Sequence, residues 1–484
     1  MSRIFVPREY QHLMLDFGME HERCNWFVGM GLGKTSSGVE LFDRLRLLGE
    51  VQRLLVLAPK RVAESSWPGE VTKWGESFGH LKVAAAIGTP EKRLAALRST
   101  PDILTINYDN IEWLMEQYGE HWPFDMVIAD ESTRLKGLRI SYQQRRKKDG
   151  TLGKEFMQGQ GASRAKALAG IAHKKVRRWV NLTGSPAPNG LVDLWGQQWF
   201  IDRGEGLGNS FDHFKKRWFT QKIGSSREQE RLEPKAHALR EIRREVKKHS
   251  IVVDARDWFD IKAPIVSHQM ITLPPAARRQ YREMEKEFFT WVGEHPLEVF
   301  AAGPKMNKCL QLASGSVLYN HEGDWAPVHK EKLEALRSIV EETNGEPLLV
   351  AYQYRADLER ILKEFPQARS LQKNSDRTIK AFQAGEIPML VVHPASAGHG
   401  LDLQHSCHIM VDYSSGWNLE LDEQVIERIG PTRQAQIGRN VAVFRYRIVA
   451  QDTLEETFIL PLLEQKAGFQ EALKNAMKRQ RALA

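Results

Sequence analysis

The segment WFVGMGLGKTS, residues 26–36, has residue types and spacing that suit the binding of phosphates. Its three glycines, at positions 29, 31 and 33, let the backbone turn successive N–H groups inward to form an anion nest. Lys34 adds a positive charge, and the Thr35 hydroxyl can ligate Mg²⁺. The pattern predicts a P-loop followed by a helix, although the P-loop rule calls for a glycine where the chain has Val28. A glycine-rich turn that only caps a helix is the alternative.

A pair of carboxylates, Asp130 and Glu131, follows a second apolar run about one P-loop domain downstream. One carboxylate at such a position can hold Mg²⁺ while its neighbour orients and deprotonates an attacking water. We assign Asp130 to the metal and Glu131 to the base. An acidic pair after a strand is common, so this assignment depends on the P-loop upstream.

Short apolar runs alternate with helical patterns on both sides of these motifs. In the first half the runs predict strands, at 54–58, 83–87, 102–111, 124–132 and 179–186. A second alternating half begins near His329, with strands predicted at 347–353, 389–394, 408–413 and 440–449. Such alternation is typical of parallel sheets, whose ligands lie at the carboxyl ends of the strands. Between the halves the chain is helical, aromatic and basic, apart from a strand expected at 251–254.

The composition favours a polyanionic partner. The 484 residues include 69 Lys and Arg against 61 Asp and Glu, a net charge of +8, and the pI is near 9.2. Much of the surplus lies between 139 and 248, in runs that could each be only a solvated face. Three separated cysteines fit a reducing compartment, and we see neither a signal peptide nor a membrane-spanning run. We therefore expect a soluble, cytoplasmic protein.

A series of further motifs points to a family. In order, MGLGKT, VLAPKRVAESSWPGEVTKW, DEST, LTGSPAPNGLVDLW, SAGHGLDL, DYSSGWNLE and QVIERIGPTRQ resemble the motifs of the Swi/Snf-type ATPases of helicase superfamily two. The resemblance implies an α/β fold of two RecA-like P-loop lobes with parallel sheets and helical arms inserted between them. It implies a first lobe at 1–200, helical arms with the last strand of that lobe at 201–328, a second lobe at 329–452 and a helical segment with a basic tail at 453–484. The compact form looks most like versions carried by bacteriophages.

The resemblance also assigns ligand-binding residues. The ATP site would comprise Arg8, Gln11, Gly29, Met30, Gly31, Leu32, Gly33, Lys34, Thr35 and Ser36, with Mg²⁺ held by Thr35 and Asp130. Arg8 and Gln11 belong to a segment that looks like the family's adenine-reading segment, and the alternative for it is an ordinary helix start. The nucleic-acid site would comprise Pro59, Lys60, Arg61, Asn107, Tyr108, Ser185, Ser396, Gly398, His399 and Trp417. The alternative for the loop after Pro59 is a packed segment with core tryptophans, and for Trp417 a buried core position.

Two arginines of QVIERIGPTRQ are candidates to stabilise charge on the γ-phosphoryl group. Arg428 matches the family's first arginine. The second should fall at Pro431, so either Arg433 replaces it on a reshaped turn or this arginine is missing; we favour Arg433. Asp402 is another departure, because it replaces a usual asparagine.

The implied function is a DNA-dependent ATPase that translocates on nucleic acid, most simply duplex DNA, by hydrolysing ATP between its lobes. Single-stranded DNA remains open as a partner. One alternative is a strand-separating DNA or RNA helicase of the same superfamily. Another is an ATP-gated DNA-binding protein with weak hydrolysis.

Overall fold

The computed structural model describes residues 3–146, 152–161, 163–222, 231–294, 303–319, 324–371, 375–397, 401–439 and 441–478. The chain divides into two compact units. Unit 1 comprises Met1–Lys222, Leu232–Trp258 and Phe469–Ala484, and unit 2 comprises Ile223–Arg231 and Phe259–Gly468. The predicted Gly398 and His399 lie outside the described residues. The domain boundaries drawn from the sequence stay a prediction.

Unit 1 is built on a seven-stranded sheet in the order β11-β1-β8-β5-β2-β4-β3, in which every neighbouring pair is parallel. Its strands are β1 (Arg23–Val28), β2 (Leu54–Ala58), β3 (Val83–Ala85), β4 (Ile103–Asn107), β5 (Met126–Asp130), β8 (Arg178–Thr183) and β11 (Ser250–Val253). The central strands are buried along their length, which is why they read as continuous apolar runs in the sequence. The α/β fold with a parallel sheet is confirmed for this half.

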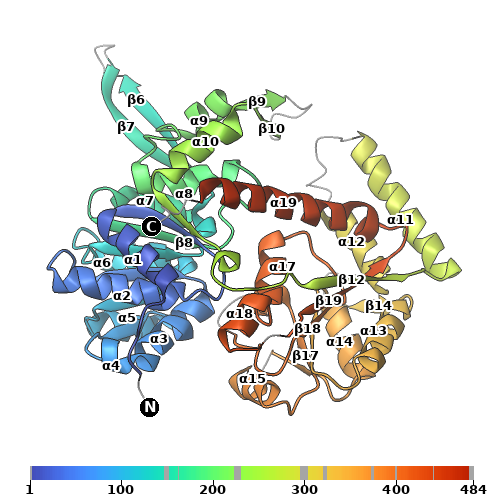
Figure 1. The fold of residues 1–484 in the computed structure, drawn as a ribbon. Coiled ribbons are helices and arrows are strands. Elements are labelled where there is room, and N and C mark those ends of the chain that lie inside the picture. The colour runs from blue at the N-terminus through green and yellow to red at the C-terminus, as the bar shows by residue number, and fades with distance from the viewer. Residues whose placement is uncertain are drawn as a thin grey trace. The chain divides into compact units, whose positions relative to one another are not determined.

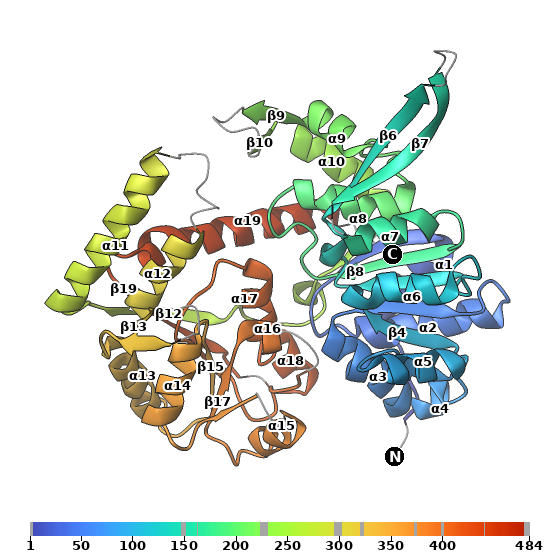
Figure 2. The ribbon, with the colours of Figure 1, turned by 180° about the vertical axis from the view of Figure 1, so that it is seen from behind.

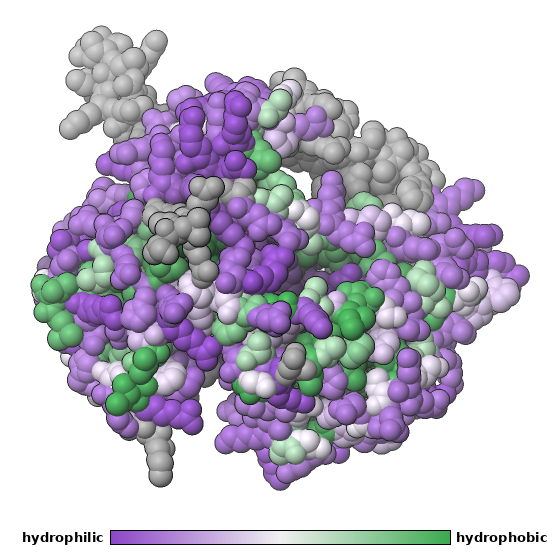
Figure 3. All heavy atoms as spheres, viewed as in Figure 1, coloured by the Kyte–Doolittle hydropathy of each residue, from purple (hydrophilic) through white to green (hydrophobic). Residues whose placement is uncertain are grey.

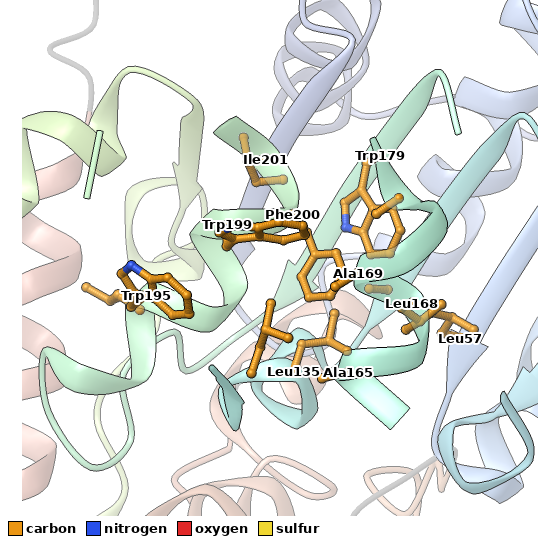
Figure 4. Packing of buried hydrophobic residues seen from close by; sticks show 14 of the residues in the cluster. Leu57, Leu135, Ala165, Leu168, Ala169, Trp179, Trp195, Trp199, Phe200 and Ile201 are labelled. Carbon is orange, nitrogen blue, oxygen red and sulfur yellow. The ribbon is translucent and has the colours of Figure 1, made fainter. Parts of the chain in front are cut away.

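Helices cover this sheet (Figure 1). They are α1 (Glu9–Glu20), α2 (Lys34–Leu47), α3 (Trp67–Lys73), α4 (Gly75–Phe78), α5 (Pro90–Arg98), α6 (Ile111–Tyr118), α7 (Ser163–Ala172) and α8 (Val192–Asp202). The aromatic side chains of α8 and β8 form part of the core, as Figure 4 shows, and the rings of Trp179 and Phe200 stack with centroids 4.7 Å apart. This packing fixes α8 against the sheet.

Several elements of unit 1 lie outside the sheet and its covering helices. Strands β6 (Leu138–Arg146) and β7 (Leu152–Gly161) pair antiparallel as a hairpin, which the sequence analysis did not predict. Helices α9 (Phe211–Trp218) and α10 (Ala238–Lys247) follow, with the short strands β9 (Phe219–Lys222) and β10 (Arg231–Pro234) between them. The hairpin extends from unit 1 in both views (Figures 1 and 2).

Unit 2 has a six-stranded sheet in the order β12-β19-β18-β15-β17-β16, again parallel throughout. Its strands are β12 (Ile265–Ile271), β15 (Leu348–Ala351), β16 (Arg369–Ser370), β17 (Met389–Val392), β18 (Ile409–Asp412) and β19 (Phe444–Ala450). The strands expected from the apolar runs are present, and the second parallel sheet is confirmed. Strand β12 precedes this half in the sequence and was not predicted.

The helices of unit 2 are α11 (Pro275–Glu294), α12 (Gly303–Ser314), α13 (Glu331–Glu342), α14 (Arg355–Glu364), α15 (Ser375–Gln383), α16 (Pro394–Ala397), α17 (Leu419–Ile426) and α18 (Pro431–Gln436). A small antiparallel pair, β13 (Ser316–Leu318) and β14 (Trp325–Pro327), lies between α12 and α13 in sequence. The final helix α19 (Leu460–Met477) begins in unit 2 and ends in unit 1. Among the described helices, none is both long enough and apolar enough to cross a bilayer.

Candidate nucleotide-binding site

The loop after β1 has the backbone conformation of an anion nest. Gly31 and Gly33 have φ of 78° and 73°, in the left-handed region that glycine tolerates. Gly33 is also crowded, because a Cβ there would lie 2.3 Å from the Gln11 Nε2 atom. Helix α2 begins at Lys34, so its N-terminus adjoins the loop. The loop can therefore present backbone N–H groups to a phosphate.

Helix α1 places its first turn against this loop. The Gln11 Nε2 atom donates to the Leu32 carbonyl (3.4 Å), and the Gln11 Oε1 atom accepts from the Arg8 backbone N–H (2.8 Å). Gln11 is buried, and its amide thus links Arg8 to the glycine loop. The structure brings the predicted adenine-reading segment and the predicted P-loop together.

Lys34 and Ser36 lie at the start of α2 with their side chains on the same loop. The Lys34 Nζ atom donates to the carbonyls of Val28 (3.0 Å) and Gly29 (3.3 Å). The Ser36 hydroxyl donates to the Gly33 carbonyl (3.1 Å). Thr35 lies between them and is half-buried. The cationic and hydroxyl groups expected from the sequence thus meet at one helix N-terminus.

Asp130 is the last residue of β5 and is buried. Its Oδ2 atom accepts a hydrogen bond from the Trp67 indole N–H (3.0 Å). Burial raises the pKa of Asp130, whereas the positive charge of Lys34 and the Trp67 N–H act in the opposite direction. Lys34 and Asp130 are therefore electrostatic neighbours although they are far apart in sequence. The carboxylate and the Thr35 hydroxyl are oxygen donors of the kind that Mg²⁺ prefers, and a bound cation would stabilise the buried charge.

Trp67 is positioned by the helix beneath it. It is fully buried, and Gly38 of α2 leaves room for its ring, since a Cβ at Gly38 would lie 2.8 Å from the ring. Of the two interpretations of this segment, the structure supports a core tryptophan at Trp67. Its indole N–H donates a hydrogen bond to Asp130 of the acidic pair.

Glu131 follows Asp130 in an unusual backbone conformation, with φ of 57° and ψ of 58°. The Tyr108 hydroxyl donates to the Asp130 carbonyl (2.9 Å), and the Tyr108 side chain is only 1% exposed. Tyr108 was predicted to contact nucleic acid, but this burial favours a role in holding the backbone of the acidic pair. Left-handed backbone at a residue other than glycine is uncommon, and strained residues of this kind cluster at functional sites.

The TGSP turn after β8 is connected to the acidic segment through Gln197 of α8. The Gln197 Oε1 atom accepts from the Ser132 hydroxyl (2.8 Å), and its Nε2 atom donates to the carbonyls of Pro186 (2.8 Å) and Asp193 (2.9 Å). Ser185 is buried within the turn, and its backbone N–H donates to the Thr183 hydroxyl (3.1 Å). One amide side chain therefore joins the segments that follow β5 and β8. Gln197 was not predicted, because nothing in its local sequence marks it.

The other nucleic-acid candidates of unit 1 follow the ends of two neighbouring strands. Pro59, Lys60 and Arg61 come directly after β2, and Asn107 ends β4. Lys60 is exposed, Arg61 is partly exposed, and Pro59 and Asn107 are buried. Because the sheet is parallel, these residues share the carboxyl edge of the sheet with the P-loop and the acidic pair.

In unit 2 the two candidate arginines differ in environment. Arg428 is buried, and its Nε atom donates to the Gln424 carbonyl (3.2 Å). Arg433 lies in the first turn of α18, which Gly430 caps and Pro431 begins, and its guanidinium pairs with the Asp402 carboxylate. Arg433 and Asp402, which both depart from the family pattern, are thus ion-pair partners.

Trp417 lines a cavity of about 320 Å³ in unit 2 and is 37% exposed. The cavity is also lined by Gln353, Ser414 and Asn418, which follow the ends of β15 and β18 or begin α17. Ser396 of α16 is exposed. Trp417 is not a buried core residue, so the core interpretation of this position is wrong.

Comparison with known proteins identifies the family. Residues 331–432 match the helicase conserved C-terminal domain. Over 479 residues the chain is 44% identical to protein p41 of Acyrthosiphon pisum secondary endosymbiont phage 1, covering 99% of this chain and 100% of the phage protein. It is 22% identical to YwqA of Bacillus subtilis, whose name describes an ATP-dependent helicase or translocase, over 88% of this chain and 44% of YwqA. The chain belongs to the Swi/Snf-type helicases of superfamily two.

Among solved structures, the SWI2/SNF2 ATPase core of Sulfolobus solfataricus in complex with double-stranded DNA aligns with this helicase at 18% identity. The alignment covers 98% of this chain and 94% of that chain, with a TM-score of 0.42. The helicase spans less than half the length of YwqA but the whole length of the phage protein. Its likeness to a bacteriophage protein is therefore confirmed along the full chain.

Proposed function

We propose that this helicase is a DNA-dependent ATPase that translocates on nucleic acid, with duplex DNA as its track. The observation that carries the proposal is the electrostatic proximity of Lys34 and Asp130 at the carboxyl edge of a parallel sheet, beside a glycine loop in nest conformation. Phosphates, a metal ion and an attacking water are the ligands that this combination suits. The similarity of this chain to helicases supports the proposal that the bound nucleotide is ATP.

In this proposal the residues of unit 1 have separate roles. Met30, the three glycines and Ser36 cradle the phosphates, Lys34 binds the γ-phosphate and Gln11 with Arg8 reads the adenine. Thr35 and Asp130 would hold Mg²⁺, which when bound neutralises charge on the β- and γ-phosphates. Glu131 orients and deprotonates the attacking water.

The arginines of unit 2 supply the remaining charge. Arg428 and Arg433 are proposed to stabilise the transferring phosphoryl group, since a guanidinium stays charged and donates in a fixed fork. The pairing of Arg433 with Asp402 supports one rival, an ATP-gated DNA-binding protein with weak hydrolysis. In that rival the arginine would remain engaged by the carboxylate.

The test is ATP hydrolysis by Lys34→Ala beside the unmodified chain, with saturating duplex DNA. We expect hydrolysis to fall to background, because the γ-phosphate loses its cation, while affinity for DNA in the absence of nucleotide stays within about twofold. Lys82→Ala, an exposed lysine before β3, is the matched control. Unchanged turnover in Lys34→Ala would show that hydrolysis occurs elsewhere or not at all.

A further inference from the structure

Four elements of unit 1 carry a large excess of basic over acidic residues: the hairpin strands β6 and β7 and the helices α9 and α10. They have nine, ten, eight and ten residues and carry eleven basic side chains against four acidic ones. This surplus of seven compares with a net charge of +8 for all 484 residues. The net positive charge is therefore concentrated on β6, β7, α9 and α10, which together we call the basic surface.

The four elements lie together within unit 1. The Arg139 guanidinium at the base of β6 lies over the Phe211 ring of α9, 3.7 Å from its centroid. Both ribbon views place the hairpin, α9 and α10 at the same end of the unit (Figures 1 and 2), and strongly hydrophilic residues cover α9 and α10 in Figure 3. The basic runs that seemed separate in the sequence thus form one region.

The charges on the helices are available to solvent. Helix α10 buries Ala238, Ile242 and Val246 against the core and leaves Arg240 and Arg244 exposed. The Arg244 side chain is 66% exposed although it contacts Glu245. On α9, Lys216 and Arg217 are exposed. The two acidic residues of α10 are partly engaged, since Glu241 accepts the Trp218 indole N–H (3.1 Å) and Glu245 pairs with Arg244.

The shape of the region suits a duplex. A two-stranded ribbon of nine or ten residues per strand is about 30 Å long, close to one turn of B-DNA, and such ribbons fit the major groove. Binding of single strands usually needs exposed aromatic rings on which bases stack. The described aromatic side chains of α9 are instead buried or partly covered, since Phe214 and Trp218 lie in the core and Phe211 lies beneath Arg139.

We propose that the basic surface binds the phosphate backbone of duplex DNA, as a contact separate from the motif residues at the carboxyl edge of the sheet. This inference rests on the proposed function in one respect, because the proposed function identifies the bound polyanion as DNA. The surface would lengthen the footprint of the motor on its track and add a salt-dependent, sequence-independent contribution to affinity.

The test measures binding of the full chain, without nucleotide, to a fluorescent duplex of about four helical turns at several salt concentrations. The variant Arg240→Gln/Arg244→Gln removes two exposed charges of α10. Lys174→Gln/Lys175→Gln removes two exposed charges from the loop before β8 and is the matched control. A third variant, Lys216→Gln/Arg217→Gln, removes two exposed charges of α9. Thermal melting of each variant checks that the fold is retained.

We expect the α10 and α9 variants each to bind the duplex roughly tenfold more weakly at about 0.1 M salt, with the slope of log K against log salt reduced by about two. The control should change by less than twofold. Affinities equal to that of the control, or a loss seen only with single-stranded DNA, would overturn the proposal. Because no ATP is present, a chain whose hydrolysis ignores DNA would refute the proposed function and leave this result standing.

Discussion

Asp130 combines two requirements that oppose each other. Its position at the end of a buried strand brings it to the nucleotide site, but burial raises its pKa and so disfavours the charge that Mg²⁺ binding needs. Trp67 reduces this conflict by donating its indole N–H to the carboxylate (3.0 Å). The sequence predicted Asp130 but not its partner, since 63 residues separate the two and only the fold brings them together.

Trp67→Phe should therefore move the acid limb of nucleotide binding to higher pH. Loss of the hydrogen bond raises the pKa of Asp130 further, so the carboxylate becomes protonated sooner as the pH falls. The measurement is the affinity for MgATP between pH 5 and 8. Trp74→Phe, which removes an indole bonded to Glu70 instead, is the control. An identical pH profile in both variants would mean that the Trp67 bond does not tune Asp130.

Substitutions of Arg433 and Asp402 test whether Arg433 acts as the second catalytic arginine. If Arg433 stabilises the transition state, Arg433→Ala should lower kcat by roughly 10³-fold. Asp402→Asn should change kcat by less than about fivefold, because the Asp402 side chain is 64% exposed and exposed ion pairs contribute little.

Arg439→Ala is the control for this pair, since Arg439 bonds to the carbonyls of Gln404 and His405 in the same unit. Steady-state ATP hydrolysis with saturating duplex DNA gives all three values. A kcat for Arg433→Ala within a few-fold of the unmodified chain would favour the rival in which hydrolysis is weak and this arginine plays no part in it.

At the scale of elements, α8 joins two segments of the site through Gln197. We expect Gln197→Ala to lower the ratio of DNA-stimulated to basal hydrolysis several-fold, because Ser132 and the Pro186 carbonyl lose their common partner. Gln198→Ala is a demanding control: Gln198 is equally buried, but it bonds to Asn25 and Asp202. Both variants should lose similar stability, about 1–3 kcal/mol. Equal loss of stimulation in the two would reduce the role of Gln197 to general stability.

The elements also show what could be predicted from the sequence. Strands such as β2 and β5 are buried on both faces, so their apolar runs alone located them. The hairpin of β6 and β7 is rich in Gln, Gly and Arg, and β12 is a partly exposed edge strand, so neither has such a run. Their formation depends on pairing with a partner strand. Local sequence does not record that pairing.

At the scale of the molecule, the two parallel sheets and the helicase family were both predicted, because short motifs in a fixed order carry more information than any single motif. The preference for duplex DNA over single-stranded DNA or RNA could not be predicted as firmly, since the charge that favours a polyanion does not distinguish one nucleic acid from another. That preference depends on surfaces such as the basic surface, which only the fold assembles.

The most direct test of the account is the rate of ATP hydrolysis by the full chain with saturating duplex DNA, compared with single-stranded DNA, RNA and no nucleic acid. We predict that duplex DNA raises the rate at least tenfold above the basal value and more than either other polymer, because the proposed motor completes its site when it engages its track. Greater stimulation by single-stranded DNA or RNA would favour the strand-separating alternative. A rate that stays at background with every polymer would contradict the account.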